Sequence, residues 1–64
     1  MRLTDLRHRL DLALGPAYAA SWAQDHVLAA LGGRTVEQAL VAGLDVVEIW
    51  RAVHAELGLP ARLR

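Results

Sequence analysis

The chain has 64 residues, enough for one domain and no second. It contains no cysteine, which excludes disulfides and cysteine-based metal sites, and its basic and acidic residues balance at 7 each. A balanced chain is not typical of a domain whose main task is to neutralise phosphates. Its longest uncharged run, residues 12–24, is too short and too rich in alanine to span a membrane. No secretory signal is evident, so we expect a cytoplasmic protein with no membrane contact.

Two helices are predicted in the first half of the chain. The first covers residues 4–14, with Thr4 as its N-cap and apolar residues at helical spacing along one face. Gly15-Pro16 ends that helix and begins the next, which is predicted to cover residues 16–31 up to a Gly-Gly stop. Because this second helix is apolar on nearly every side, we expect it to be central and covered by its neighbours. The inward face of the first helix is expected to carry Leu3, Leu6, Leu10, Ala13 and Leu14.

Two more helices are predicted over residues 35–43 and 45–57. Thr35 and Asp45 each stand three residues before a Gln or Glu, which is the spacing of a capping box. The last helix has the strongest pattern, with its large apolar residues on one stripe, and Gly and Pro follow it. Residues 60–64 are expected to form a frayed tail.

No stretch shows the alternating pattern of a strand. The sequence therefore predicts an all-α fold in a single domain of residues 1–64. We expect four helices, joined by short turns, to form a compact orthogonal bundle.

Asp25 and His26 are the polar exceptions in the second helix, and they could form an acid–base pair. A metal needs three or four converging ligands, however, and the 3 histidines lie on three separate predicted helices. Adjacent helical residues also point about 100° apart, so Asp25 does not orient the His26 ring. We expect Asp25 to pair instead with Arg34 and to hold the second helix against the following turn.

The turn at residues 32–35 leads into a helix N-terminus, which could attract an anion with help from Arg34. It lacks the lysine and the preceding strand of a phosphate loop, so a structural turn is the favoured interpretation. The only serine has no base nearby. The sequence therefore predicts no catalytic residues, no metal, no cofactor, no small-molecule substrate and no enzymatic activity.

The last two helices have a pattern similar to a helix-turn-helix motif. Gly43 falls in the turn, and small residues such as Ala39 and Ala52 occupy the positions where the helices would cross closely. On the outward face only Arg51 is suited to contact a base edge, while two glutamates would repel phosphates. Weak DNA binding, supported by the terminal arginines, is therefore the alternative function and not the favoured one.

The leading prediction is a protein-interaction or regulatory accessory module. Tyr18, Trp22 and Trp50 are expected in the core, but a domain this small need not cover both tryptophans. A partly exposed tryptophan rimmed by arginine is a typical interface anchor, so we expect a protein partner or self-association. The residues expected to take part are Trp22, Asp25, His26, Arg34, Trp50, Arg51 and His54.

Several short stretches resemble a known family. They include Met1-Arg2-Leu3-Thr4, Asp25-His26-Val27-Leu28, Leu31-Gly32-Gly33-Arg34-Thr35 and Trp50-Arg51-Ala52. These residues resemble the DUF3046 family, a small actinobacterial family of unknown function, and the resemblance covers essentially the whole chain. Its members are often encoded near RecA and RecX, which implies a cytosolic setting close to DNA repair. The resemblance implies no activity, catalytic residue or cofactor.

Overall fold

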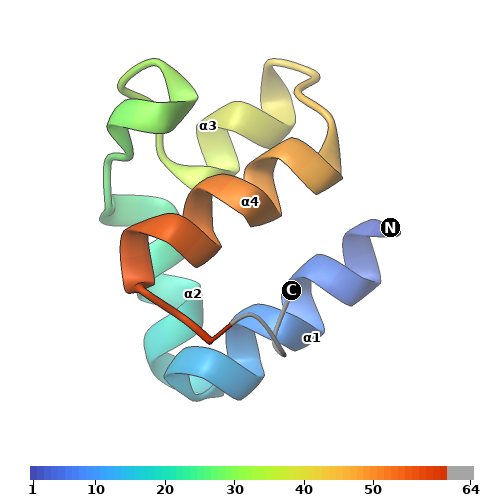
Figure 1. Cartoon of the computed structure of the whole chain (residues 1–64), viewed down its shortest axis with the longest axis vertical. Coiled ribbons are helices and arrows are strands. Elements are labelled where there is room, and N and C mark those ends of the chain that lie inside the picture. Colours follow the sequence, from blue (N-terminus) through green and yellow to red (C-terminus); the bar gives the residue numbers. More distant parts are fainter. Residues whose placement is uncertain (61–64) are drawn as a thin grey trace.

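The computed structural model describes residues 1–60 and is helical throughout most of that range (Figure 1). It confirms the all-α prediction: within the described range the only β pairing is an isolated bridge between Leu28 and Arg34. None of the described helices combines the length and the apolar character needed to cross a membrane. The predicted frayed tail falls, from residue 61 on, outside the described residues. The elements are α1 (Leu3–Leu14), α2 (Pro16–Asp25), the 3-10 turn η1 (Ala29–Leu31), α3 (Val36–Val41) and α4 (Val46–Leu57).

Helix α1 begins one residue earlier than the sequence predicts. Arg2 is its N-cap, and the Asp5 carboxylate accepts a hydrogen bond of 3.1 Å from the Arg2 backbone N–H. Thr4 therefore lies inside the first turn and does not cap the helix, because the acidic side chain three residues after Arg2 satisfies the free amide. Leu3 lies at the solvent-facing start of this helix and stays 46% exposed, so only part of the predicted inward face is buried.

The predicted second helix is not continuous. Helix α2 ends at Asp25, and the chain becomes extended at His26 before the short η1 turn. On an unbroken helix Leu31 would point about 180° away from Trp22, so the two could not enter one core. The break lets Trp22, Leu28 and Leu31 all become buried, and the Leu28 N–H donates to the Arg34 carbonyl at 3.0 Å.

Local capping defines the last two helices. Both predicted N-caps are confirmed, but the predicted capping box is complete only at Thr35, while Asp45 caps α4 without Glu48. The Thr35 hydroxyl accepts from the Gln38 N–H at 3.1 Å, and the Gln38 side chain accepts from the Thr35 N–H at 3.0 Å, which is a complete capping box. The Asp45 carboxylate caps α4 by accepting from the Val47 N–H at 3.0 Å. Helix α3 is shorter than predicted because the chain already turns before Gly43, whose φ of +84° ends the helical path.

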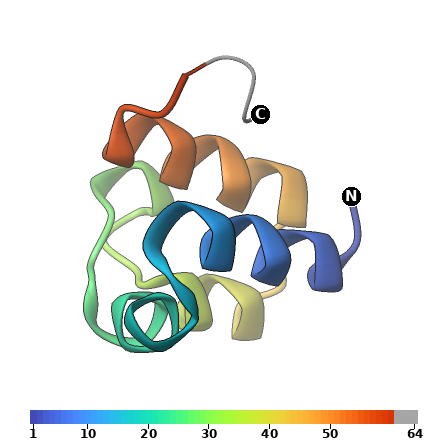
Figure 2. The ribbon, with the colours of Figure 1, turned by 90° about the horizontal axis from the view of Figure 1, so that it is seen from below.

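The helices enclose one core. Helix α1 packs most extensively against α2, which crosses it steeply and is seen end-on in Figure 2. Helices α1 and α4 lie side by side and run in the same direction in Figures 1 and 2. Trp22 and Trp50 are both buried, at 6% and 3% exposed, which confirms that they belong to the core and shows that this small domain does cover both. Tyr18 lies on the solvent side of α2 and is 59% exposed, so the prediction that it belongs to the core is wrong. The core residues are Leu6, Leu10, Ala19, Trp22, Ala23, Leu28, Leu31, Val36, Ala39, Ile49, Trp50, Ala52 and Val53.

Candidate functional site

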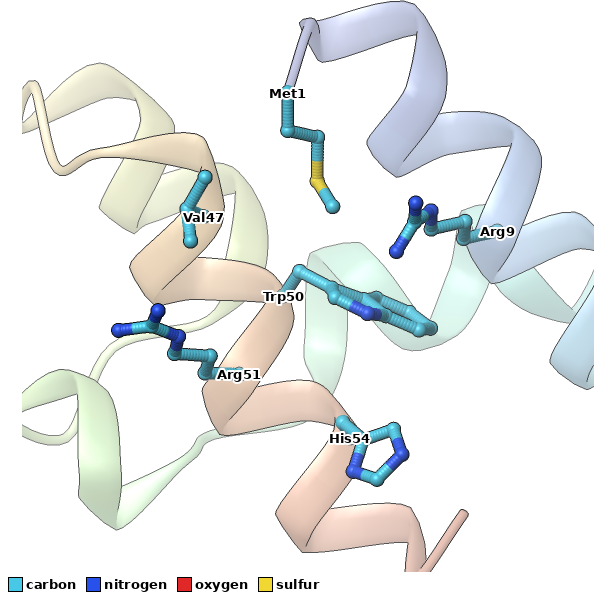
Figure 3. A pocket seen from close by; sticks show the side chains of 6 residues that line it. All are labelled: Met1, Arg9, Val47, Trp50, Arg51 and His54. Carbon is cyan, nitrogen blue, oxygen red and sulfur yellow. The ribbon is translucent and has the colours of Figure 1, made fainter. Parts of the chain in front are cut away.

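A pocket of about 460 Å³ lies between α1 and α4 (Figure 3). Helix α4 contributes four residues at the spacing i, i+3, i+4 and i+7, which places them on one face of the helix. The start of the chain and the middle of α1 complete the wall. We call it the Trp50 pocket, and its lining residues are Met1, Arg9, Val47, Trp50, Arg51 and His54.

The indole of Trp50 forms the floor of this pocket. The Arg9 guanidinium carbon lies 5.7 Å from the ring centroid, within the range of a cation–π contact, and the His54 ring meets the indole edge to face at 6.1 Å. The indole nitrogen Nε1 is buried, and no acceptor for its hydrogen lies among residues 1–60. Buried donors are nearly always bonded, so this one marks a place where an acceptor is missing.

The charged side chains that line the Trp50 pocket, Arg9 and Arg51, are both positive. Neither Arg9 nor Arg51 makes an ion pair or a side-chain hydrogen bond to any described residue, and no lining residue is acidic. The Nε2–H of His54 donates to the Pro60 carbonyl at 2.8 Å, which fixes the ring beside the indole. The pocket therefore combines an apolar floor with two unneutralised guanidinium groups.

A smaller hollow of about 60 Å³ continues the same surface along α1. Arg9 and Trp50 line both spaces, and the additional walls are Leu12 and Ala13. Leu12 is 70% exposed, so this end of the surface is apolar and open to solvent.

The predicted pair Asp25 and His26 belongs to a different place. His26 stacks on Trp22 with ring centroids 4.7 Å apart, and its Nε2 lies 3.1 Å from a Glu56 carboxylate oxygen on α4. Asp25 accepts a long bond of 3.4 Å from the Ser21 hydroxyl. With Tyr18 these side chains line a separate, shallow hollow of about 200 Å³ at the end of α2.

The predicted pairing of Asp25 with Arg34 is wrong. The Arg34 guanidinium folds back and donates to the Leu31 carbonyl at 3.1 Å, because the break after α2 places that carbonyl within its reach. Arg34 thus stabilises its own turn, while His26 connects the end of α2 to α4. Among the described residues no cluster of three or more His, Asp or Glu side chains could hold a metal ion.

Of the seven residues singled out from the sequence, the Trp50 pocket unites three, namely Trp50, Arg51 and His54. Val47 was missed as a site residue, although its position three residues before Trp50 on the same helical stripe is a usable signal. Arg9 and Met1 were also missed. They reach the pocket only because α1 lies beside α4, and the spacing of residues within one helix does not predict that pairing.

The structure is that of a small all-α protein with a pocket between its first and last helices. Residues 1–62 match the family described as "Protein of unknown function (DUF3046)", and the chain belongs to this family. The comparisons with curated proteins and with solved structures found no match.

Proposed function

We propose that this DUF3046 protein is a protein-interaction module that docks a partner protein on the surface between α1 and α4. The observation that carries the proposal is the Trp50 pocket, in which an indole floor lies next to two arginines that make no ion pair with any of residues 1–60. Aromatic and arginine side chains dominate the energy of protein interfaces, and a concave site with a few polar groups is the usual form of a binding pocket.

The neighbouring surface supports this proposal. Leu12 is 70% exposed next to the pocket, so an apolar side chain of a partner would gain contact area there. About 25 cal/mol is gained for each Å² of apolar surface removed from water, so an aliphatic contact over Leu12 and Trp50 would contribute to affinity. The role we propose needs no catalytic group.

Nucleic acid is the weaker candidate for the same surface. The formal net charge of the chain is zero, and Glu48 and Glu56 are exposed on α4, the helix that carries Arg51. Duplex DNA binds most proteins through many phosphate contacts, and carboxylates on the docking helix would oppose them. A helix-turn-helix role for α3 and α4 therefore stays the less favoured alternative.

Site-specific photo-crosslinking tests the proposal. A benzoylphenylalanine at Leu12 lies beside the Trp50 pocket, whereas the same group at Val41 on α3, where the side chain is 90% exposed, serves as the matched control. We expect a discrete crosslinked protein from position 12 in cells of the source organism and none from position 41. The purified pair should then bind directly in solution.

Two outcomes would contradict this function. Crosslinks that form equally at positions 12 and 41 would show that the partner does not bind specifically to the surface between α1 and α4. Light scattering that finds a stable homo-oligomer crosslinked through position 12 would assign the surface to self-association.

A further inference from the structure

We propose that the Trp50 pocket binds a side-chain carboxylate from an acidic segment of the partner protein, held by the indole N–H of Trp50 and the guanidinium group of Arg9. The Arg51 side chain, which points away from the indole in Figure 3, swings toward the bound carboxylate and completes the site. This inference rests on the proposed docking function and adds the chemistry that is recognised. The occupant is an extended segment in which a glutamate or aspartate stands two residues from an aliphatic residue.

The first argument is the missing acceptor. Trp50 is only 3% exposed, and its Nε1–H has no partner among residues 1–60 although the residue lines the pocket. An indole can only donate, so the group that satisfies it must carry a lone pair. Met1 points toward the ring in Figure 3, is 43% exposed and is unbranched, so a change of its rotamer would open the approach to the indole.

The second argument is the contrast among the arginines. Arg7 is bonded to Glu37 across two helices, and Arg34 is bonded to the Leu31 carbonyl. Arg9 and Arg51 have no such partner in the described chain, yet both line the same pocket. A guanidinium matches a carboxylate in shape and charge and can bind it through two parallel hydrogen bonds.

The third argument selects a peptide over a free anion. Met1, Val47 and the indole give the pocket an apolar wall, and the hollow beside Leu12 and Ala13 extends it. A free ion would leave these apolar surfaces in water. A segment with an acidic residue and, two residues away, an aliphatic one covers both parts at once, because alternate side chains of an extended segment point to the same side and can enter adjacent hollows.

The test is an NMR titration of the 15N-labelled full chain with two blocked peptides. One is acetyl-Ala-Leu-Ala-Glu-Ala-Leu-Ala-amide, and the other carries Gln in place of Glu. The chain has only 2 tryptophans, so its two indole N–H signals are resolved, and the Trp22 signal serves as the internal control. We expect the Glu peptide to shift the Trp50 indole signal saturably, with a dissociation constant about tenfold lower than that of the Gln peptide.

Variants locate the effect. Arg9→Gln and Arg51→Gln should each raise the dissociation constant of the Glu peptide by about tenfold. The dissociation constant of the Gln peptide should stay nearly the same. Gln24→Glu, at an exposed position of α2, lowers the net charge by the same single unit away from the pocket and should change neither affinity by more than about twofold. Arg51 and Gln24 are exposed, whereas Arg9 is half-buried over the Trp50 indole, so urea denaturation of each variant first checks that the fold is unchanged. Trp50→Phe should abolish the preference for Glu if the variant folds.

Two of the remaining outcomes would overturn carboxylate recognition, and a third separates it from the proposed docking function. An unmoved Trp50 indole, or equal affinity for both peptides, would overturn carboxylate recognition even if a partner still crosslinks at position 12. A short DNA duplex that shifts the Trp50 signal when the Glu peptide does not would assign the surface to nucleic acid. If no partner crosslinks but the Glu peptide is preferred, the docking function fails while the anion chemistry of the pocket stands.

Discussion

Arg7 and Glu37 form the one ion pair in residues 1–60 that includes an arginine, and it joins α1 to α3. Both guanidinium nitrogens take part: Nη1 donates to Oε2, and Nη2 donates to Oε1 at 2.8 Å. We expect Glu37→Gln to lower the free energy of unfolding by up to about 1 kcal/mol, because the half-exposed pair is screened by water. Urea denaturation measures the change. Glu48→Gln, which removes an exposed carboxylate with no bonded partner in the described chain, should cost less than about 0.5 kcal/mol.

The same pair makes a prediction about pH. The hydrogen bond from Arg7 lowers the pKa of Glu37 below its ordinary value of 4.5, although desolvation opposes this shift. A carboxylate with a lowered pKa in the folded state stabilises the fold above the unfolded pKa and stops doing so as the pH falls through the folded pKa. The stability difference between the wild type and Glu37→Gln should therefore be complete at neutral pH, shrink below 4.5 and vanish in stronger acid. A difference that stays constant over this range in urea titrations would contradict it.

His26 stabilises the chain through two separate contacts, the stack on Trp22 and the bond to Glu56. We expect His26→Ala to lower the free energy of unfolding by about 1–2 kcal/mol, because stacked aromatic rings contribute about 0.5–1.5 kcal/mol and an exposed ion pair adds less. His26→Phe keeps a ring over Trp22 and should recover most of the loss. Thermal unfolding of both variants separates the two contributions. Equal losses would show that the bond to Glu56 dominates.

Residue by residue, the sequence predicts what is local. The caps at Thr35 and Asp45 are correct because the groups that bond lie within three residues of each other. The partners of His26 and Arg7 each lie 30 residues away, and no spacing rule links them. The predicted pair of Asp25 and Arg34 assumes a continuous helix up to the Gly-Gly turn. Because the helix ends at Asp25 and the chain is extended at His26, the two side chains do not meet.

At the scale of elements, the break between α2 and η1 is the main departure from the predicted helices. The run of alanines before it favours a helix, and nothing local at His26 or Val27 forbids one. The break is a tertiary effect, since it is the burial of Leu28 and Leu31 that an unbroken helix would prevent. Helix propensity differs by less than about 1 kcal/mol per residue, which burying two leucines exceeds.

Two glycines test how the turn after η1 is stabilised. Gly32 and Gly58 both adopt positive φ, +71° and +64°. A Cβ added at Gly32 would lie 2.8 Å from the Arg34 guanidinium, whereas a Cβ added at Gly58 would meet none of the described atoms within 4 Å. Gly58→Ala should cost about 1–2 kcal/mol from backbone strain alone. Gly32→Ala should cost about 1 kcal/mol more, because Arg34 must give up its bond to the Leu31 carbonyl.

The double variant isolates that bond. When Arg34→Ala has already removed the guanidinium, Gly32→Ala should cost no more than Gly58→Ala does in the wild type. Urea denaturation of the four proteins gives the coupling energy. If the costs of Gly32→Ala and Arg34→Ala simply add, Gly32→Ala does not act by displacing the Arg34 guanidinium from the Leu31 carbonyl.

At the scale of the whole molecule, the Trp50 pocket exists because α1 and α4 lie side by side (Figure 2). The periodicity of α4 places Trp50, Arg51 and His54 on one face, so the sequence could assemble half of the site. The other half depends on which helices become neighbours, and four helices with similar apolar stripes allow several arrangements. In the sequence Arg9 is therefore an ordinary surface arginine, and only the packing of α1 against α4 brings it over the Trp50 ring.

The last prediction concerns the cooperativity of this small core. The radius of gyration is 10.5 Å, close to the value of about 11 Å expected for a fully folded domain of this length, and both tryptophans belong to one buried cluster. Trp22→Phe leaves Trp50 as the only reporter, and Trp50→Phe leaves Trp22. In each variant we expect tryptophan fluorescence and far-UV circular dichroism to follow the same urea transition, with a slope of about 1 kcal/mol per M. If the fluorescence of Trp50 changed before the helical signal, α1 and α4 would separate ahead of global unfolding. The pocket would then be a loosely held surface, and partner binding would have to stabilise the contact between α1 and α4 as well as fill the space between them.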